Sequence, residues 1–179
     1  MTHITEGTPV HLCELLACKE RRAKTQLSWL KTYGVPLVSF SINMPGPVKL
    51  NPMSEHIFAQ GLAALEAACH ERGWILIAQQ IHHEKTGPEG IFAVQGVSAS
   101  ILKKQMMHIE KTHPVGRLMD LDVIDKQGKS ISRKAYQIGR RKCLVCQEDA
   151  VVCARSRRHP LQELLTKIEE MTHADECCH

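Results

Sequence analysis

Long apolar runs are absent from this chain of 179 residues. A helix that crosses a membrane needs about 20 consecutive apolar residues, and no stretch of the sequence approaches that length. The first residues also lack the basic and apolar segments that make up a secretory leader. We therefore expect a cytoplasmic protein with no membrane partner.

Aromatic residues are scarce, at 4% of the chain. Sheets that bind nucleic acid commonly stack bases on aromatic side chains, so this composition argues against a nucleic-acid partner. Internal repeats and low-complexity segments are also absent. The length suits one domain with a buried core, and we expect a single domain over residues 1–179. Within it we expect a central core over residues 37–136 and a basic, Cys/His-rich extension over residues 140–179.

Positive charge is unevenly distributed, although the net charge is only +4. Residues 103–158 contain 14 lysines and arginines against 6 aspartates and glutamates. A basic region around a phosphate-binding site and a solvated basic face explain this equally well. The chain also has eight cysteines. In the reducing cytoplasm these are expected to be free thiols or metal ligands rather than disulfides.

Apolar periodicity and helix-end residues predict an α+β protein. Proline and asparagine mark helix starts, and glycine marks helix ends. The order of elements in the middle of the chain is βαββαβ, which is typical of a ferredoxin-like antiparallel sheet with both helices on one face. The other face would then be free for a ligand. The predicted elements are a helix from 8 to 34, a strand at 35–42, a helix at 51–73, a strand at 74–81, a turn at 87–90, strands at 91–94 and 118–124, a helix at 98–112, a hairpin return at 130–136 and a helix from 160.

The predicted strand 118–124 carries the most informative pattern. Alternate residues of a strand project to opposite faces, so Met119, Leu121 and Val123 would face the core. Asp120 and Asp122 would share the open face. Paired carboxylates repel unless a cation lies between them, and Mg²⁺ prefers carboxylate, water and phosphate oxygens. The pattern therefore favours a Mg²⁺ site, although two solvated aspartates are an alternative.

Several basic residues near this strand are candidates to bind phosphate. Arginine suits that task because its guanidinium donates in a fork. Arg117 lies three residues before Asp120, the first residue of the acidic pair Asp120 and Asp122. Further along the chain the candidates are Arg133, Arg140, Arg141 and Lys142.

The cysteines of the extension are spaced like the ligands of a structural zinc site. Such sites use four Cys or His ligands around a tetrahedral ion. The candidates are Cys143, Cys146, Cys153 and His159. Cysteines buried as small apolar residues are the alternative interpretation.

Six blocks of the sequence, in order and over essentially the whole chain, resemble the CitX family, the apo-citrate lyase phosphoribosyl-dephospho-CoA transferases. The Gly-Arg-Leu-x-Asp-x-Asp-Val block and the cysteine-rich tail make the resemblance specific. The blocks are Leu37-Val38-Ser39-Phe40, Pro45-Gly46-Pro47-Val48-Lys49, Gly87-Pro88-Glu89-Gly90, His113-Pro114-Val115-Gly116-Arg117-Leu118-x-Asp120-x-Asp122-Val123, Arg141-Lys142-Cys143-Leu144-Val145-Cys146 and Cys153-Ala154-Arg155.

The resemblance implies a nucleotidyltransferase-type enzyme. The substrate would be 2'-(5''-triphosphoribosyl)-3'-dephospho-CoA, and the prosthetic group would be attached to a serine of the acyl carrier (gamma) subunit of citrate lyase with release of diphosphate. On this hypothesis Asp120 and Asp122 hold Mg²⁺, and Arg117 binds the triphosphate or the diphosphate. His113 is a candidate to accept the serine proton, or else simply a residue at a helix end.

Two matters stay open at the level of sequence. A third metal-binding carboxylate is not identified, and the candidates are Glu89, Glu110 and Asp125. The alternative functions are a zinc-containing nucleic-acid-binding module and a zinc-stabilised assembly factor without chemistry of its own.

Overall fold

The chain forms two compact units in the computed structural model, which describes residues 7–136 and 139–176. Unit 1 is Met1–Ile131 and unit 2 is Ser132–His179. Each is described by itself below.

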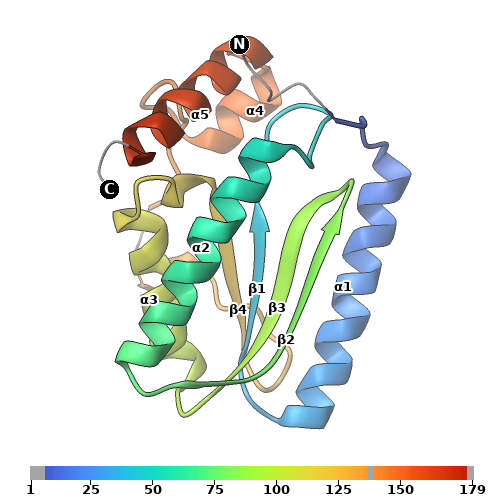
Figure 1. Ribbon diagram of the computed structural model, residues 1–179, viewed down its shortest axis with the longest axis vertical. Helices are drawn as coiled ribbons and strands as arrows, with labels where there is room; N and C mark the ends of the chain where they lie inside the picture. The colour runs from blue at the N-terminus through green and yellow to red at the C-terminus, as the bar shows by residue number, and fades with distance from the viewer. Residues whose placement is uncertain (1–6, 137–138, 177–179) are drawn as a thin grey trace. The chain divides into compact units, whose positions relative to one another are not determined.

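From residue 7 onward, unit 1 contains three α-helices and four strands (Figure 1). Local signals place several ends where they were expected: Asn51 caps α2 through its side chain, Ser98 caps α3, and Gly34 ends α1 in the left-handed conformation. The elements are α1 (Leu12–Tyr33), β1 (Leu37–Ile42), α2 (Pro52–Glu71), β2 (Ile75–Glu84), β3 (Gly87–Gln95), α3 (Ala99–Thr112), the 3₁₀ turn η2 (Gly116–Leu118) and β4 (Met119–Ile124).

The four strands form one sheet in the order β2-β3-β1-β4, and all neighbours are antiparallel. This order follows from the βαββαβ sequence when each helix crosses over one intervening strand. The predicted ferredoxin-like α+β fold, with an N-terminal helix added, is therefore confirmed.

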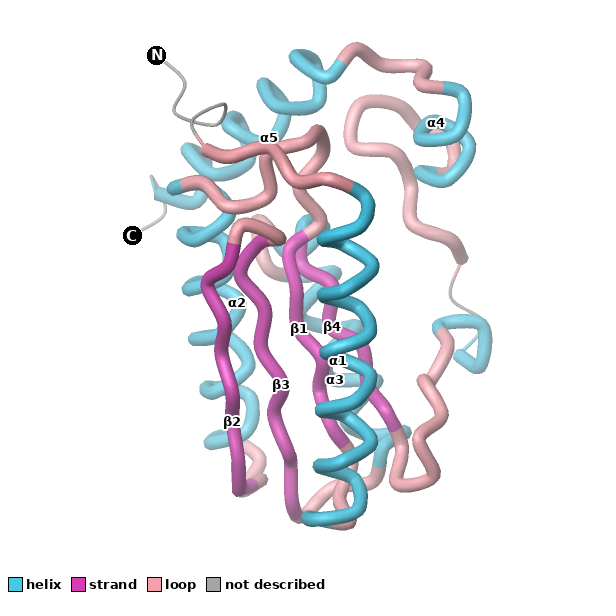
Figure 2. The backbone as a smooth tube through the Cα atoms, turned by 90° about the vertical axis from the view of Figure 1, so that its right-hand side faces the viewer, coloured by secondary structure: helices cyan, strands magenta, loops and turns pink. Residues whose placement is uncertain are grey.

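The helices α2 and α3 cover one face of the sheet and enclose the main core (Figure 2). Phe40 of β1 stacks on Phe58 of α2 with ring centroids 4.6 Å apart. Gly61 of α2 lets the ring of Phe40 approach, because a Cβ at this position would lie within van der Waals overlap of it. This packing holds the helices against the sheet and fixes which residues of each strand face inward.

The helix α1 covers part of the opposite face, which Figure 2 shows clearly. Trp29 and Leu30 pack against a small apolar cluster that includes Leu37 and Ala93. The prediction that this face is entirely free is therefore wrong. The physical reason is that the part of this face around Leu37 and Ala93 is apolar, and the C-terminal half of α1 shields it from water.

Two local predictions are also wrong. The predicted turn 87–90 belongs to β3, and the actual turn precedes it at residues 85–86. Gly90 pairs with Phe40, and a Cβ there would lie 2.7 Å from the Phe92 ring, so glycine serves packing rather than turning. The predicted return strand 130–136 is reduced to a single bridge between Ile124 and Ser130, and a 3₁₀ turn η3 (Arg133–Tyr136) follows it.

The described residues of unit 2 include two α-helices, α4 (Ala150–Ser156) and α5 (Leu161–Glu176). The predicted C-terminal helix after Pro160 is confirmed, whereas α4 was not predicted. Leu165 and Ile168 of α5 are buried, as are Cys143 and Cys153. None of the helices in the described part of either unit is long and apolar enough to span a membrane.

Candidate functional site

The strand β4 places the acidic pair as its alternation predicts. Met119, Leu121 and Val123 are fully buried against the helices. Asp120 is half-buried, and the side chain of Asp122 is 53% exposed. The two carboxylates therefore share the face opposite the main core, where a solvated ion and a substrate have access to them.

The pair lies on an edge strand whose outer side is closed by charged residues of α3. Leu121 directs its N–H and C=O away from β1, at the edge of the sheet. Its N–H donates to Glu110 Oε1 at 2.9 Å, and its C=O accepts from Lys103 Nζ at 3.0 Å. Both charged side chains are buried. These bonds hold β4 firmly at the point where the acidic pair projects.

Lys103 also provides a positive charge beside the acidic pair. Its Nζ lies 3.5 Å from Oδ1 of Asp122, although its side chain is only 2% exposed. The cation required to offset the repulsion of two neighbouring carboxylates is thus supplied in part by the protein. The binding of Mg²⁺ by this pair stays a prediction.

The three candidates for a third carboxylate lie in different places. Ser41 of β1 pairs with Glu89 of β3 on one side and with Asp120 of β4 on the other. Glu89 therefore projects from the same face as the acidic pair. Glu110 is occupied at the edge of β4. Asp125 lies in a turn and accepts backbone N–H bonds from residues 127 and 129. Only Glu89 is on the candidate site's face.

Arg117 and His113 come just before β4 in the chain. Arg117 is exposed in η2. His113 ends α3, and its Nδ1 accepts the N–H of Val115 at 3.3 Å. A neutral imidazole has one acceptor nitrogen, so this hydrogen bond must break before His113 can accept a proton. Its role as a base stays a prediction.

The other predicted phosphate-binding residues belong to unit 2. Lys142 Nζ lies 3.0 Å from Asp149 Oδ1, and Arg140 Nη1 lies 3.9 Å from Asp149 Oδ2. Arg141 is half-buried, and its C=O accepts the N–H of Ala150. Arg133 lies in η3 and is half-buried. These residues are therefore in a different unit from the acidic pair.

Two arginines of α1 were missed at the level of sequence. Arg21 and Arg22 both bind the buried carboxylate of Glu89. Arg21 lies 68 and Arg22 lies 67 residues before Glu89 in the chain, so no local pattern connects them. The one available signal was that Glu89 lies in one of the six blocks that resemble the CitX family, where nothing in the neighbouring sequence explains an acidic residue.

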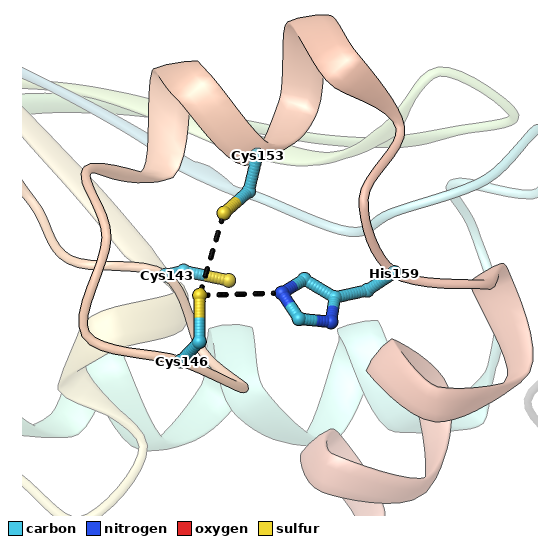
Figure 3. A group of neighbouring side chains, drawn as sticks. All are labelled: Cys143, Cys146, Cys153 and His159. Atoms are coloured by element: carbon cyan, nitrogen blue, oxygen red, sulfur yellow. Dashed lines mark hydrogen bonds between the residues drawn. The ribbon is translucent and has the colours of Figure 1, made fainter.

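The four cysteine and histidine residues of the extension converge in unit 2, as Figure 3 shows. Their ligand atoms all lie within 4.8 Å of one another. The Sγ atoms of Cys146 and Cys153 are 3.5 Å apart, and Nε2 of His159 is 3.3 Å from Cys146 Sγ. Ligand atoms around a tetrahedral zinc are separated by roughly 3.5–3.8 Å, given its bond lengths. The cluster is therefore a group that could hold a metal ion.

Short elements bring these ligands together. Cys143 donates its N–H to the C=O of Glu148, which folds the Cys-x-x-Cys segment back on itself. Cys153 comes from α4, and this helix ends at Arg157, whose φ of 48° reverses the chain. The reversal brings His159, two residues before α5, back toward the cysteines.

The pKa values of two thiols in the cluster are shifted in opposite directions. Hydrogen bonds from the backbone of Glu148 and from His159 lower the pKa of Cys146 to about 6, whereas burial raises the pKa of Cys153 to about 12. The thiolate is the form of cysteine that binds metals. On the far side of the imidazole, Nδ1 of His159 lies 3.3 Å from Glu163 Oε2. Carboxylates commonly hold metal-binding histidines in this way.

Comparison with known proteins decides the family. The family model described as "CitX: Apo-citrate lyase phosphoribosyl-dephospho-CoA transferase" matches residues 10–175. A Vibrio cholerae serotype O1 (strain M66-2) protein named "Probable apo-citrate lyase phosphoribosyl-dephospho-CoA transferase" is 54% identical over 94% of this chain and 95% of its own length. An Escherichia coli O1:K1 protein named "Apo-citrate lyase phosphoribosyl-dephospho-CoA transferase" is 37% identical over 94% of this chain and 92% of its own length.

The chain belongs to the CitX family.

Membership in the CitX family makes the chain a transferase. The match covers both units, since it extends from α1 to α5. The acidic pair and the Cys/His cluster both lie within the matched residues. The comparisons favour this interpretation over a nucleic-acid-binding module and over an assembly factor without chemistry.

Proposed function

We propose that the chain transfers the phosphoribosyl-dephospho-CoA group from 2'-(5''-triphosphoribosyl)-3'-dephospho-CoA to a serine of the apo acyl carrier (gamma) subunit of citrate lyase. The observation that carries the proposal is the match to transferases of this name over residues 10–175. The placement of Asp120 and Asp122 on one accessible face supports it, because a phosphate-transfer reaction needs a way to neutralise polyphosphate charge.

The reaction forms one bond and breaks another at the same phosphorus. The serine oxygen of the carrier attacks the phosphorus nearest the ribose, and the bond from that phosphorus to the next phosphate breaks. Diphosphate leaves with the electron pair of that bond. The serine proton passes to a base, for which His113 is our candidate once its bond to Val115 is released.

The residues of the acidic pair would hold Mg²⁺, which supplies charge neutralisation at the phosphates when bound. Lys103 holds Asp122 in place beside that site. Arg117 is placed by sequence next to the pair and is proposed to bind the triphosphate or the departing diphosphate. Arginine is suited to this because charge builds up on the leaving phosphates during transfer.

Unit 2 has a separate proposed part in the function. Arg133, Arg140, Arg141 and Lys142 give it a basic surface for the phosphates or for the carrier. The reaction partners are water-soluble molecules of the bacterial cytoplasm, so we propose that the protein works there. Neither a membrane nor a nucleic acid is required.

We also propose that the ion held by Cys143, Cys146, Cys153 and His159 is Zn²⁺ in a structural role. Three thiolates and an imidazole are typical zinc ligands, and four protein ligands leave no open position for a substrate. Metal analysis of the purified protein should give one zinc per chain. Substoichiometric zinc, with no change in unfolding on chelation, would remove this assignment.

The transferase proposal is tested by reconstitution. The protein is incubated with the apo carrier subunit, the triphosphoribosyl precursor and Mg²⁺, and the carrier is weighed by mass spectrometry. We expect the carrier to gain the mass of the phosphoribosyl-dephospho-CoA group, together with stoichiometric release of diphosphate. A carrier whose target serine is replaced by alanine is the matched control. An unchanged mass of the native carrier contradicts the proposal.

A further inference from the structure

A polar row crosses the sheet on the face that α1 partly covers. Ser41 of β1 is paired with Glu89 of β3 on one side and with Asp120 of β4 on the other. Directly paired residues of antiparallel strands project to the same face. Glu89 and Asp120 therefore face the same side, two strand spacings apart, which is about 10 Å between their Cα atoms.

Glu89 is buried at one end of this row and binds two arginines of α1. Its Oε1 accepts from Arg21 Nη2 at 2.9 Å, and its Oε2 accepts from Arg22 Nε at 3.0 Å. The Cys18 thiol donates to Oε2 at 3.4 Å. Burial acts to raise the pKa of Glu89, but the bond from Arg21 and the charge of Arg22 outweigh it and the pKa lies below its ordinary value. Glu89 is thus an ionised anchor and not a free metal ligand.

The anchor leaves part of Arg22 available. Glu89 occupies Nε and Nη2 of this guanidinium, and Nη1 has no hydrogen-bond partner among the described residues. The side chain is 26% exposed. Arg21 also bonds Glu84, so the two arginines and two carboxylates are together neutral, and the feature open to a ligand is the guanidinium edge of Arg22 that carries Nη1. The second partner of Arg21, Glu84, is 44% exposed, and such surface pairs are weak.

The open guanidinium edge of Arg22 is held by Glu89, which projects from the same face of the sheet as the acidic pair, and a guanidinium donates well to phosphate oxygens. We propose that Arg22, oriented by Glu89, binds the terminal phosphates of the triphosphate substrate while Asp120 and Asp122 serve the phosphate that is attacked. Arg22 is then a substrate-binding residue, and Glu89 is a positioning residue. This inference rests on the proposed function for the identity of the substrate. It places a phosphate-binding group in the same unit as the acidic pair, which the predicted basic run of unit 2 does not.

The inference can be tested without turnover. Inorganic triphosphate with Mg²⁺ is titrated into the full-length protein by calorimetry, and Arg22→Gln, Arg22→Lys and the control Arg72→Gln are compared with wild type. Arg72 is also an arginine, but it bonds Gln105 and lies over Trp74 away from this row. We expect Arg22→Gln to weaken triphosphate binding by about tenfold or more, as is usual for hydrogen bonds to a charged group. Arg22→Lys should recover part of the loss, and Arg72→Gln should match wild type.

A measurement on the unaltered chain covers the case in which Arg22→Gln does not fold. Phenylglyoxal modifies accessible guanidinium groups, and peptide mass analysis identifies each modified arginine. Triphosphate with Mg²⁺ should protect Arg22 and leave Arg72 reactive. Equal labelling of Arg22 with and without triphosphate, or unchanged affinity of a folded Arg22→Gln protein, overturns the inference.

These outcomes separate the two proposals. Triphosphate binding that depends on Arg22, without transfer to the carrier, supports the binding site and contradicts the proposed function. Transfer to the carrier with a KM that Arg22→Gln does not change supports the proposed function and contradicts the binding site. A residue that only fastened α1 to the sheet would alter unfolding without altering the affinity for triphosphate.

Discussion

The acidic pair of unit 1 and the Cys/His cluster of unit 2 are assembled in different ways. Asp120 and Asp122 are neighbours because a strand directs alternate residues to one face, and the strand is held by a large core. The cluster instead gathers ligands from a turn, the short helix α4 and the segment between α4 and α5. In unit 1 packing determines where the functional groups lie, whereas in unit 2 the functional groups themselves join the elements.

The difference follows from the size of each unit. Unit 1 has a sheet with a helix layer on one side and α1 on the other, so most of its strands are buried. Unit 2 has fewer than 50 residues and only a few buried apolar side chains, such as Leu165 and Ile168. Chains of that size commonly need a metal or a disulfide to fold. A bound ion would therefore matter much more to unit 2.

The largest effect is expected from removing one ligand of the cluster. Cys146→Ser should abolish zinc binding, because it removes one of the four proposed ligands. The effect on unit 2 should be large, since structural zinc contributes about 10–16 kcal/mol to small sites at neutral pH. Hydrogen exchange should then show loss of protection at residues 143–159, while β1 to β4 stay protected. Cys13→Ser, which changes an exposed cysteine of α1, serves as the control. Loss of protection in both units would show that they are not independent.

Truncation of a large core side chain in unit 1 should have the opposite result, with stability lost in unit 1 and unit 2 unaffected. Phe58→Ala removes a fully buried ring that stacks on Phe40, and such changes cost about 3–5 kcal/mol. Denaturant unfolding should show this loss for unit 1, with the zinc content unchanged. Leu27→Ala, at a side chain that is 57% exposed, should change stability by less than about 0.5 kcal/mol.

Neutralising the acidic pair should affect chemistry and leave folding intact. Asp122→Asn and Asp120→Asn should each lower the transfer rate by roughly 10²–10³-fold, a typical loss when one electrostatic contact to a transition state is removed. The rate is measured from the mass gain of the carrier. The control is Glu66→Gln, at an exposed carboxylate of α2. Retained activity in either aspartate variant removes the metal-binding role from that residue.

The smallest effect concerns the pH dependence of stability. Because the pKa of Glu89 is lowered from 4.5 in the folded protein, its ion pairs stabilise the fold above that pH. This contribution is lost as the pH falls through the folded pKa. Wild type should therefore be more stable than Glu89→Gln at neutral pH, and the gap should narrow below pH 4.5. A gap that stays constant down to acid unfolding would contradict the linkage.

Much of the fold was accessible from sequence because local chemistry decides it. Asn51 and Ser98 cap helices with their own side chains, and Gly34 adopts a left-handed conformation that other residues avoid. The alternation of β4 predicted the shared face of the acidic pair, since burial of every second residue is a property of any half-buried strand.

What could not be predicted depends on contacts between distant segments. Glycine and proline at residues 87–90 favour a turn locally, yet Gly90 is required by the aromatic rings of the core. The choice of face for α1 was equally hidden, because its partners are residues 37, 78, 91, 93 and 124 on four strands. The pairing of Arg22 with Glu89 has the same cause, and it is visible only once the sheet is formed.

The closed edge of β4 has a consequence for how the protein meets its carrier. An exposed edge strand invites another chain to add a strand to the sheet. Here the outward N–H and C=O of Leu121 are both taken by buried charged groups of α3. A strand from another chain would have to displace Glu110 and Lys103 from Leu121. Their charged groups would then be buried without these hydrogen bonds, which is costly. If the proposed function holds, extension of the sheet at this edge is therefore a costly route for the carrier, and its serine would reach the acidic pair from the open side of β4.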